Sequence, residues 1–217
     1  MGRENKKQAV AALHREKILQ AAETLFSEKG FDQTTIQNIS QVSSYSRRTI
    51  YAYYDSKEDI MHHIIENGLL QLSHDIQTVL QNKEGFLSHY FAVCAAMVRY
   101  QTDCPQSFKH VMEAHTENLN LEQLADTVQR IFALGTEINE HLARWIEEGK
   151  QQKVVRQDVV PLMTVYVLWS SVTSFIDLVQ TKGAFLCKQF AMTQQDLYAY
   201  GFRQIINGIL EERISHE

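Results

Sequence analysis

The chain has 217 residues, 44% of them hydrophobic and 22% charged, which argues against disorder and allows one large domain or a small domain joined to a larger one. Its three cysteines form no CxxC pair, and no stretch approaches the ~18 uninterrupted apolar residues of a membrane span, so neither a disulfide framework, a zinc site nor a membrane anchor is expected in this cytoplasmic protein. The formal net charge of −5 is uneven, because residues 1–60 hold nine Lys and Arg against eight Asp and Glu, whereas the rest is acidic.

The first helix is predicted from His14 to Gly30. Its apolar side chains recur at the spacing of one face of an amphipathic helix, and Gly30 is a typical left-handed cap. Residues 1–13 are expected to form a loose basic arm, either a solvated terminus or a segment that contacts the minor groove or a phosphate of DNA.

A second, short helix is expected to begin at Thr34, where Gln37 completes a capping box three residues later. Ser43 and Ser44 compete for its backbone hydrogen bonds and end it. A further short helix follows directly after this polar break. Two short helices around such a break are typical of a helix-turn-helix.

This third helix is predicted from about Ser46 to Tyr53, with Ile50 buried and Arg47 and Arg48 facing outward. An α-helix fits the major groove of DNA, arginine can donate two parallel hydrogen bonds to guanine, and tyrosine hydroxyls reach phosphates. The stretch Thr34–Lys57 is therefore predicted to read double-stranded DNA.

A long fourth helix opens with a capping box at Ser56 and Asp59 and continues through Leu80. At ~1.5 Å per residue it is long enough to leave a DNA-binding domain at 1–56 and enter a second domain at 57–217. Further helices are expected at about 86–101, 105–116, 120–149, 158–182 and 193–213, which makes an all-α fold of about nine helices.

The last two helices suggest a homodimer. The helix at 158–182 is apolar nearly all round, and the last helix carries two glycines on one stripe, although each mid-helix glycine costs roughly 1 kcal/mol. A four-helix interface across a two-fold axis would cover both, unless the glycines admit another helix of the same chain. The interface is predicted to contain Trp169, Val172, Ile176, Leu197, Gly201, Gln204 and Gly208.

The sequence over about residues 14–65 resembles the TetR family of transcriptional repressors. The motifs that carry the resemblance are ILxAAxxLF at Ile18–Phe26, GF at Gly30, TT at Thr34, TIYxYY at Thr49–Tyr54 and SKE at Ser56. The resemblance implies an operator-binding homodimer that a small molecule releases from DNA. The remainder of the chain matches the family only in its helical architecture.

The same resemblance assigns roles to residues in the helix-turn-helix. It implies phosphate contacts for Thr35, Tyr51 and Lys57 and base contacts for Gln37, Ser46, Arg47 and Thr49, with Arg48 and Tyr53 added to the predicted DNA-binding set. The chain departs from the family at Ser44 and Arg48, where glycine is usual, and at Tyr45. A positive φ at Ser44 would strain the turn, and Arg48 is expected either to read a base or to bind a phosphate.

An effector pocket is expected among the central helices, and their aromatic and thioether side chains favour a flat or apolar small molecule, although for any single one of them core packing is the better explanation. The predicted pocket contains Phe91, Met97, Tyr100, Phe108, Met112, Phe132, Tyr166 and Trp169, with His115 and Ser170 as polar members.

Two other classes of function remain as alternatives. A helical enzyme would need a site, yet there is no GxSxG, no phosphate-cradling glycine loop and no catalytic constellation, and no cofactor is expected. The pairs His62 with Glu66 and His110 with Glu113 offer too few ligands for a metal. A protein-binding helical adaptor would leave the arginines and tyrosines of the third helix without a shared purpose.

Overall fold

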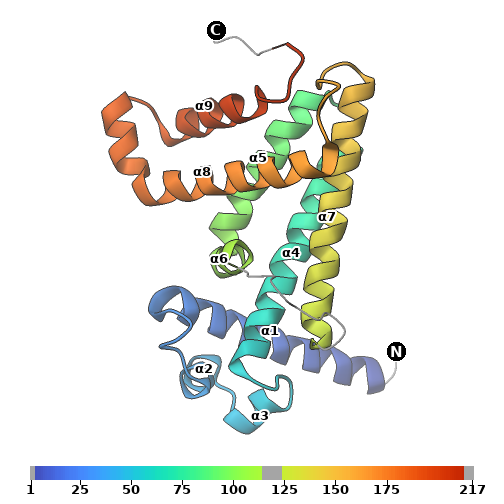
Figure 1. Ribbon diagram of the computed structural model, residues 1–217. Helices are drawn as coiled ribbons and strands as arrows, with labels where there is room; N and C mark the ends of the chain where they lie inside the picture. Colours follow the sequence, from blue (N-terminus) through green and yellow to red (C-terminus); the bar gives the residue numbers. More distant parts are fainter. Residues whose placement is uncertain (1–2, 114–123, 213–217) are drawn as a thin grey trace. The chain divides into compact units, whose positions relative to one another are not determined.

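The computed structural model describes residues 3–113 and 124–212, and these ranges hold nine α-helices and no strand (Figure 1). The expected all-α fold is confirmed. The helices are α1 (Arg3–Lys29), α2 (Ile36–Ser43), α3 (Arg47–Tyr51), α4 (Lys57–Gln81), α5 (Phe86–Asp103), α6 (Pro105–Glu113), α7 (Asp126–Gln151), α8 (Pro161–Phe190) and α9 (Gln194–Ile206).

The chain divides into two compact units. Unit 1 comprises Met1–Leu69 and Cys104–Phe132, and unit 2 comprises Leu70–Asp103 and Ala133–Glu217. The long helices α4 and α7 contribute residues to both units. The sequence placed a domain boundary after residue 56, whereas packing groups the first half of α4, α6 and the start of α7 with the N-terminal helices.

In unit 1, α1 packs against α2 and α6, and α2 packs against α3 (Figure 1). The apolar stripe of α1 is buried, with Ile18 and Phe26 at 0% and 1% exposure. After α1 the chain turns at Gly30, whose φ of 83° suits a residue without a side chain. The hydroxyl of buried Thr34 donates to the carbonyls of Gly30 and Leu25 and closes this turn.

The start of α1 differs from the prediction. Residues 1–13 were expected to form a loose arm, but the helix already begins at Arg3. Between Arg3 and His14 the sequence contains three alanines and two lysines and neither proline nor glycine, so intrinsic helix propensity favours this extension. Lys6 to Val10 are exposed, and the extension therefore gains little from tertiary packing.

In unit 2, α8 packs along α9, and both contact α5. The Tyr90 hydroxyl donates to the carbonyl of Phe202 at 2.9 Å and ties α5 to α9 in the buried core, and burial raises the pKa of Tyr90. The reversal between α8 and α9 uses a left-handed residue, Ala191, with φ 52°. The predicted capping pair of Thr193 and Asp196 is confirmed at the start of α9.

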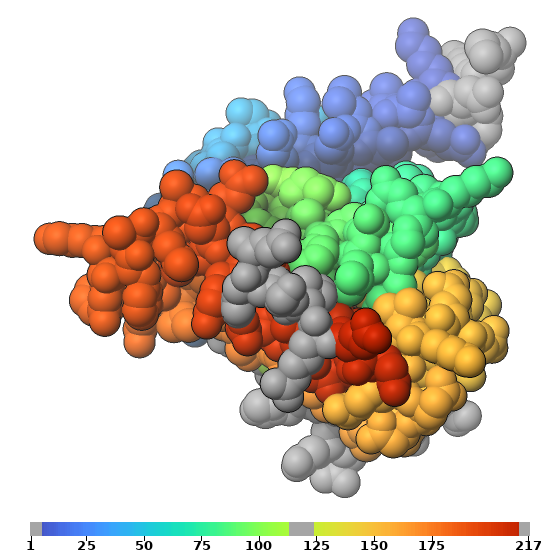
Figure 2. All heavy atoms as spheres, turned by 90° about the horizontal axis from the view of Figure 1, so that it is seen from above, coloured from blue at the N-terminus to red at the C-terminus, as the bar shows by residue number. Residues whose placement is uncertain are grey.

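Several helix ends also differ from the sequence prediction. α8 continues to Phe190 instead of stopping near 182, whereas α9 ends at Ile206 instead of 213. Beyond α9, Leu210 pairs with Val155 in an isolated antiparallel bridge, and Figure 2 shows the dark red chain end beside the gold segment that follows α7. α7 begins at Asp126, and the parts of two predicted helices that fall at 114–123 lie outside the described residues.

α8 is the one helix among the described residues that is long and apolar enough to cross a membrane by length and composition. The core helix of a soluble protein meets the same test, so this property is weak evidence for a membrane span. Much of the apolar surface of α8 is exposed within the single chain.

Candidate nucleic-acid interface

The link between α2 and α3 is a tight turn in which Ser44 lies in the left-handed region, with φ 61° and ψ 20°. This confirms the positive φ considered for Ser44, a conformation that costs a non-glycine residue roughly 1–2 kcal/mol. Two side chains support the turn: the Ser40 hydroxyl donates to the carbonyl of Tyr45 at 2.6 Å, and the Ser43 hydroxyl accepts from the Tyr45 amide at 3.3 Å. The start of α3 is thereby held at a defined place relative to α2.

The N-terminus of α2 is capped one residue later than predicted. The Thr35 hydroxyl accepts from the Asn38 amide at 3.2 Å, and the Asn38 side chain accepts from the Thr35 amide at 3.0 Å. The predicted box of Thr34 and Gln37 is therefore wrong, because Thr34 is buried behind the helix start. Gln37 is left exposed on α2, free of any capping role.

The α3 helix is short and well anchored. Ser46 caps its N-terminus by accepting from the Thr49 amide at 3.1 Å, and the two hydroxyls of this pair lie 2.8 Å apart. Ile50 is fully buried and fixes the helix to the unit. Arg47 and Arg48 are exposed, and neither has a carboxylate partner within residues 3–113 and 124–212.

Two of the predicted DNA-binding side chains also make contacts inside unit 1. The Tyr53 hydroxyl lies 3.1 Å from His14 Nδ1, and the Arg15 guanidinium lies 5.2 Å from the centre of the Tyr53 ring. Lys57 Nζ donates to the Phe31 carbonyl at 2.8 Å and lies 4.1 Å from the centre of the Phe31 ring. Thr49 is half-buried. The remaining predicted residues are exposed: Thr35, Gln37, Ser46, Arg47, Arg48 and Tyr51.

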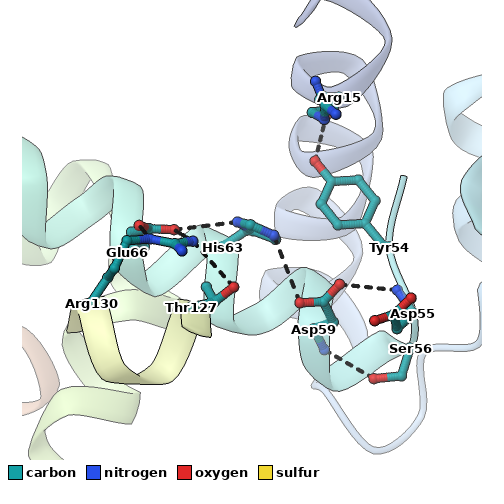
Figure 3. Close-up of polar contacts among 9 residues, drawn as sticks. All are labelled: Arg15, Tyr54, Asp55, Ser56, Asp59, His63, Glu66, Thr127 and Arg130. Carbon is teal, nitrogen blue, oxygen red and sulfur yellow. Dashed lines mark hydrogen bonds and ion pairs between the residues drawn. The ribbon is translucent and has the colours of Figure 1, made fainter. Parts of the chain in front are cut away.

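The segment between α3 and α4 is fastened at both ends (Figure 3). The hydroxyl of buried Tyr54 donates to the Arg15 carbonyl at 3.3 Å, and burial raises the pKa of Tyr54 to about 12. Asp59 in α4 accepts from the Asp55 amide at 3.0 Å, while its own amide donates to the Ser56 hydroxyl at 3.0 Å. The predicted cap by Ser56 is thus present, and the reciprocal bond goes to Asp55.

Along α4 from this cap lies an ion-pair cluster that the sequence prediction missed (Figure 3). Arg130 of α7 donates two hydrogen bonds to the largely buried carboxylate of Glu66, one from Nε and one from Nη2 at 3.1 Å. Its Nη2 also donates to the Thr127 hydroxyl at 3.3 Å. His63 lies 3.3 Å from Glu66 and 3.7 Å from Asp59. The Arg130 hydrogen bonds hold the pKa of Glu66 below its usual range, so this carboxylate stays charged.

Of the two histidine and glutamate pairs considered as metal ligands, only that of His62 and Glu66 is described in full. Glu66 is bound to Arg130 and His63, and the side chain of Glu113 lies outside the described residues. Over the described part of the chain, no group of three or more His, Cys, Asp and Glu side chains is placed to hold a metal ion. His62 is half-buried, and this burial lowers its pKa.

The predicted effector-pocket residues are divided between the two units, and those of unit 2 line different sites. Met97 and Trp169 line a small, partly open cavity of about 30 Å³ in unit 2, and Phe91 lines a separate, more open groove of about 580 Å³ between α5, α8 and α9. Of the other predicted residues, Tyr100 and Phe108 are buried, Phe132 is half-buried, and Met112, Tyr166 and Ser170 are exposed, while His115 lies outside the described residues. Of the described residues of this set, Phe108, Met112 and Phe132 belong to unit 1, and Phe91, Met97, Tyr100, Tyr166, Trp169 and Ser170 belong to unit 2.

The predicted dimer-interface residues are similarly divided. Val172, Ile176, Leu197 and Gly201 are buried within unit 2 itself, which removes them from the surface open to a partner. A Cβ at Gly201 would overlap the ring of Phe175 in α8, so this glycine admits a side chain of its own chain, the alternative left open by the sequence. Trp169 is half-buried, and Gln204 and Gly208 are exposed.

The geometry of α2, the Ser44 turn and α3 defines a helix-turn-helix protein. Residues 18–64 match the family model of the bacterial regulatory proteins of the tetR family. This span begins in α1, contains α2 and α3 entirely, and ends in α4. Over these residues the chain is similar to the TetR family.

Individual relatives agree with this assignment. The HTH-type transcriptional regulator YfiR of Bacillus subtilis is 44% identical over 52 residues, which are 24% of this chain and only 25% of YfiR. The negative transcriptional regulator IcaR of Staphylococcus aureus is 25% identical over 153 residues, or 70% of this chain and 80% of IcaR. SmeT, the repressor of a Stenotrophomonas maltophilia multidrug efflux pump, shares the fold with a TM-score of 0.66 at 14% identity, over 91% of both chains.

Proposed function

We propose that this protein is a sequence-specific DNA-binding regulator of transcription whose helix α3 enters the major groove. The observation that carries the proposal is the pair Arg47 and Arg48, both exposed at the start of an anchored helix and without a carboxylate partner in the described part of the chain. A guanidinium that donates two hydrogen bonds to a guanine contributes about 1–3 kcal/mol of discrimination against other bases.

The exposed Tyr51 side chain can donate its hydroxyl proton to a phosphate, and Thr35 can do so when its hydroxyl turns away from Asn38 Oδ1, to which it donates at 2.9 Å. Thr35 lies at the N-terminus of α2, where the helix dipole favours an anion. Lys57 uses one of its three ammonium protons on the Phe31 carbonyl and keeps two for a phosphate. Tyr53 supports the interface through His14 instead of reaching outward.

We infer that the protein acts as a cytoplasmic homodimer through α8 and α9. The support is the apolar surface of α8, on which Leu162, Met163, Tyr166 and Val167 are 48–64% exposed in the single chain. A second copy related by a two-fold axis would cover it. Replacing Val167 by glutamate should shift the sedimentation coefficient towards that of a monomer, whereas the same substitution at exposed Ala125 should leave it unchanged.

We further propose that the protein represses transcription and that a small-molecule effector releases it from DNA. Support comes from IcaR, a negative transcriptional regulator, and from SmeT, a repressor that has also been solved as a complex with triclosan. Because α4 and α7 contribute to both units, a ligand that favours one conformation of these helices would change the population of DNA-competent dimers. A helical adaptor or a helical enzyme would not explain why Arg47 and Arg48 are both exposed on α3, and YfiR, IcaR and SmeT are regulators.

The test is to select bound fragments from random DNA and then measure affinity and its salt dependence for variants. Arg47→Ala should weaken the selected site more than random DNA, because it removes a base contact. Lys57→Ala should weaken both alike and reduce the salt slope by about one unit. Arg144→Ala, an exposed arginine of α7, is the matched control and should change neither. Equal losses on both DNAs for Arg47→Ala would show that another residue reads the bases.

A further inference from the structure

His14 of α1 contacts the chain on both sides of α3. Its ring centre lies 4.7 Å from that of Tyr45, in the turn that leads into α3, and the two ring planes are tilted by 48°. Beyond the end of α3, the Tyr53 hydroxyl lies 3.1 Å from His14 Nδ1, and the two rings meet edge to face. One side chain of α1 therefore contacts a residue before the proposed reading helix and a residue after it.

Two further contacts keep Tyr53 beside α1. The Arg15 guanidinium lies 5.2 Å from the centre of the Tyr53 ring, and the hydroxyl of the next residue, Tyr54, donates to the Arg15 carbonyl at 3.3 Å. Tyr53 itself is only half-buried, and a hydroxyl that has one hydrogen-bond partner can still bind a second. In the chain Tyr53 lies between Tyr51 and Lys57, the two side chains after the start of α3 that are proposed above to bind phosphates.

The direction of the hydrogen bond between His14 and Tyr53 depends on the charge of the imidazole. A phenol is a stronger donor than a neutral imidazole, so in the neutral pair Tyr53 donates its proton to Nδ1 and has only lone pairs left for a second partner. An imidazolium carries protons on both nitrogens, so it must donate to the Tyr53 oxygen, which releases the tyrosine proton for another acceptor. Protonation of His14 therefore converts Tyr53 from an acceptor into a donor towards its second partner.

The surroundings of His14 leave the charge of its imidazolium unpaired. The side chains that face its ring from the rest of unit 1 are Tyr45 and Tyr53, and the charged side chains near it on α1 are Arg15 and, one turn further along, Lys17. Over residues 3–113 and 124–212, no carboxylate lies within ion-pair distance of His14. The positive charge would therefore be available to an anion outside the protein, and the Tyr45 ring offers it a favourable aromatic contact.

We propose that His14 is a positioning residue that makes DNA binding depend on pH, because its protonated ring donates to Tyr53 and thereby directs the Tyr53 hydroxyl proton to a DNA phosphate. A phosphate oxygen only accepts hydrogen bonds, so the neutral pair presents the wrong group to it and the protonated pair presents the right one. The added positive charge acts in the same direction. The affinity for DNA therefore rises as the pH falls. This inference rests on the proposed function, since it needs DNA beside α3.

The affinity of the full-length protein for its selected DNA tests the inference when it is measured between about pH 8 and about pH 5.5, the range in which histidine changes its charge. Circular dichroism at each pH shows that the helices remain folded. The wild-type protein should bind about tenfold more tightly at the lower pH, as expected for one hydrogen bond to a charged group. His14→Gln, which is uncharged at every pH, should lose this rise. His74→Gln, at an exposed histidine of α4 in unit 2, is the matched control and should keep it.

A second substitution separates the hydrogen bond from the charge. Tyr53→Phe keeps the ring beside His14 but removes the hydroxyl, so it should keep only the part of the rise that is due to charge, about threefold. No rise in the wild-type protein, an equal rise in His14→Gln, or a full rise in Tyr53→Phe overturns the proposal. These outcomes leave DNA binding itself intact and refute this inference alone, whereas a wild-type protein that binds no DNA at any pH refutes the proposed function and this inference with it.

Discussion

The ion pair between Arg130 and Glu66 should stabilise unit 1 measurably. The Glu66 side chain is 12% exposed and that of Arg130 is 51% exposed, so the pair lies between fully buried and fully exposed ion pairs. Breaking a fully buried pair costs about 3–5 kcal/mol, whereas exposed pairs contribute about 0–1 kcal/mol. With two hydrogen bonds and one half-solvated partner, we expect a coupling free energy of about 1–2 kcal/mol.

Urea unfolding at fixed protein concentration, followed by helical circular dichroism, gives this quantity from a double-mutant cycle. Arg130→Ala leaves a buried carboxylate with only His63 beside it, so adding Glu66→Ala should recover part of the lost stability. The pair of Arg99 and Asp75 is the matched control, since it has a single contact of 3.3 Å and Arg99 is 55% exposed. Losses that simply add for Arg130 and Glu66 would refute the reasoning.

Three further predictions concern stability. In the folded protein the pKa of Glu66 lies below 4.5 and that of His62 lies below 6.5, so the unfolded chain binds protons more readily at both groups. The free energy of unfolding should therefore fall as the pH drops below 6.5, and fall again as it drops below 4.5. Glu66→Gln should flatten the lower step when unfolding in urea is measured at a series of pH values. Ser44→Gly should raise the unfolding free energy by about 0.5–1 kcal/mol, since glycine adopts positive φ freely; an unchanged or lower value contradicts this. Gly201→Ala should lower the free energy of unfolding by about 1–3 kcal/mol, because the new Cβ overlaps the ring of Phe175. Gly135→Ala, whose Cβ would lie in open space within α7, should raise it by about 0.5–1 kcal/mol. Equal effects of the two substitutions would contradict the packing described.

Local sequence signals were sufficient to predict the helix-turn-helix. The polar break at Ser44, the buried Ile50 and the outward arginines were readable because they depend on neighbours within a few residues. The cap of α2 was misplaced by one position, since Thr34 and Thr35 are both suitable caps and only the burial of Thr34 against α1 decides between them.

Long-range features were not readable in the same way. Glu66 and Arg130 are 64 residues apart in the chain, and no sequence pattern in either helix predicts that they form an ion pair. α8 is apolar on every face, so periodicity could not show that Val172 and Ile176 point inward while Tyr166 points outward.

Selection of bound fragments from random DNA tests the central claim most directly. A dimeric reader with α3 in the major groove should yield one motif with two inverted half-sites, centred about 10 base pairs or a multiple apart, and Arg47→Ala should lose the preference at particular base pairs within each half. Recovery of fragments without a shared motif, or of a motif that Arg47→Ala and Arg48→Ala both leave intact, would contradict it.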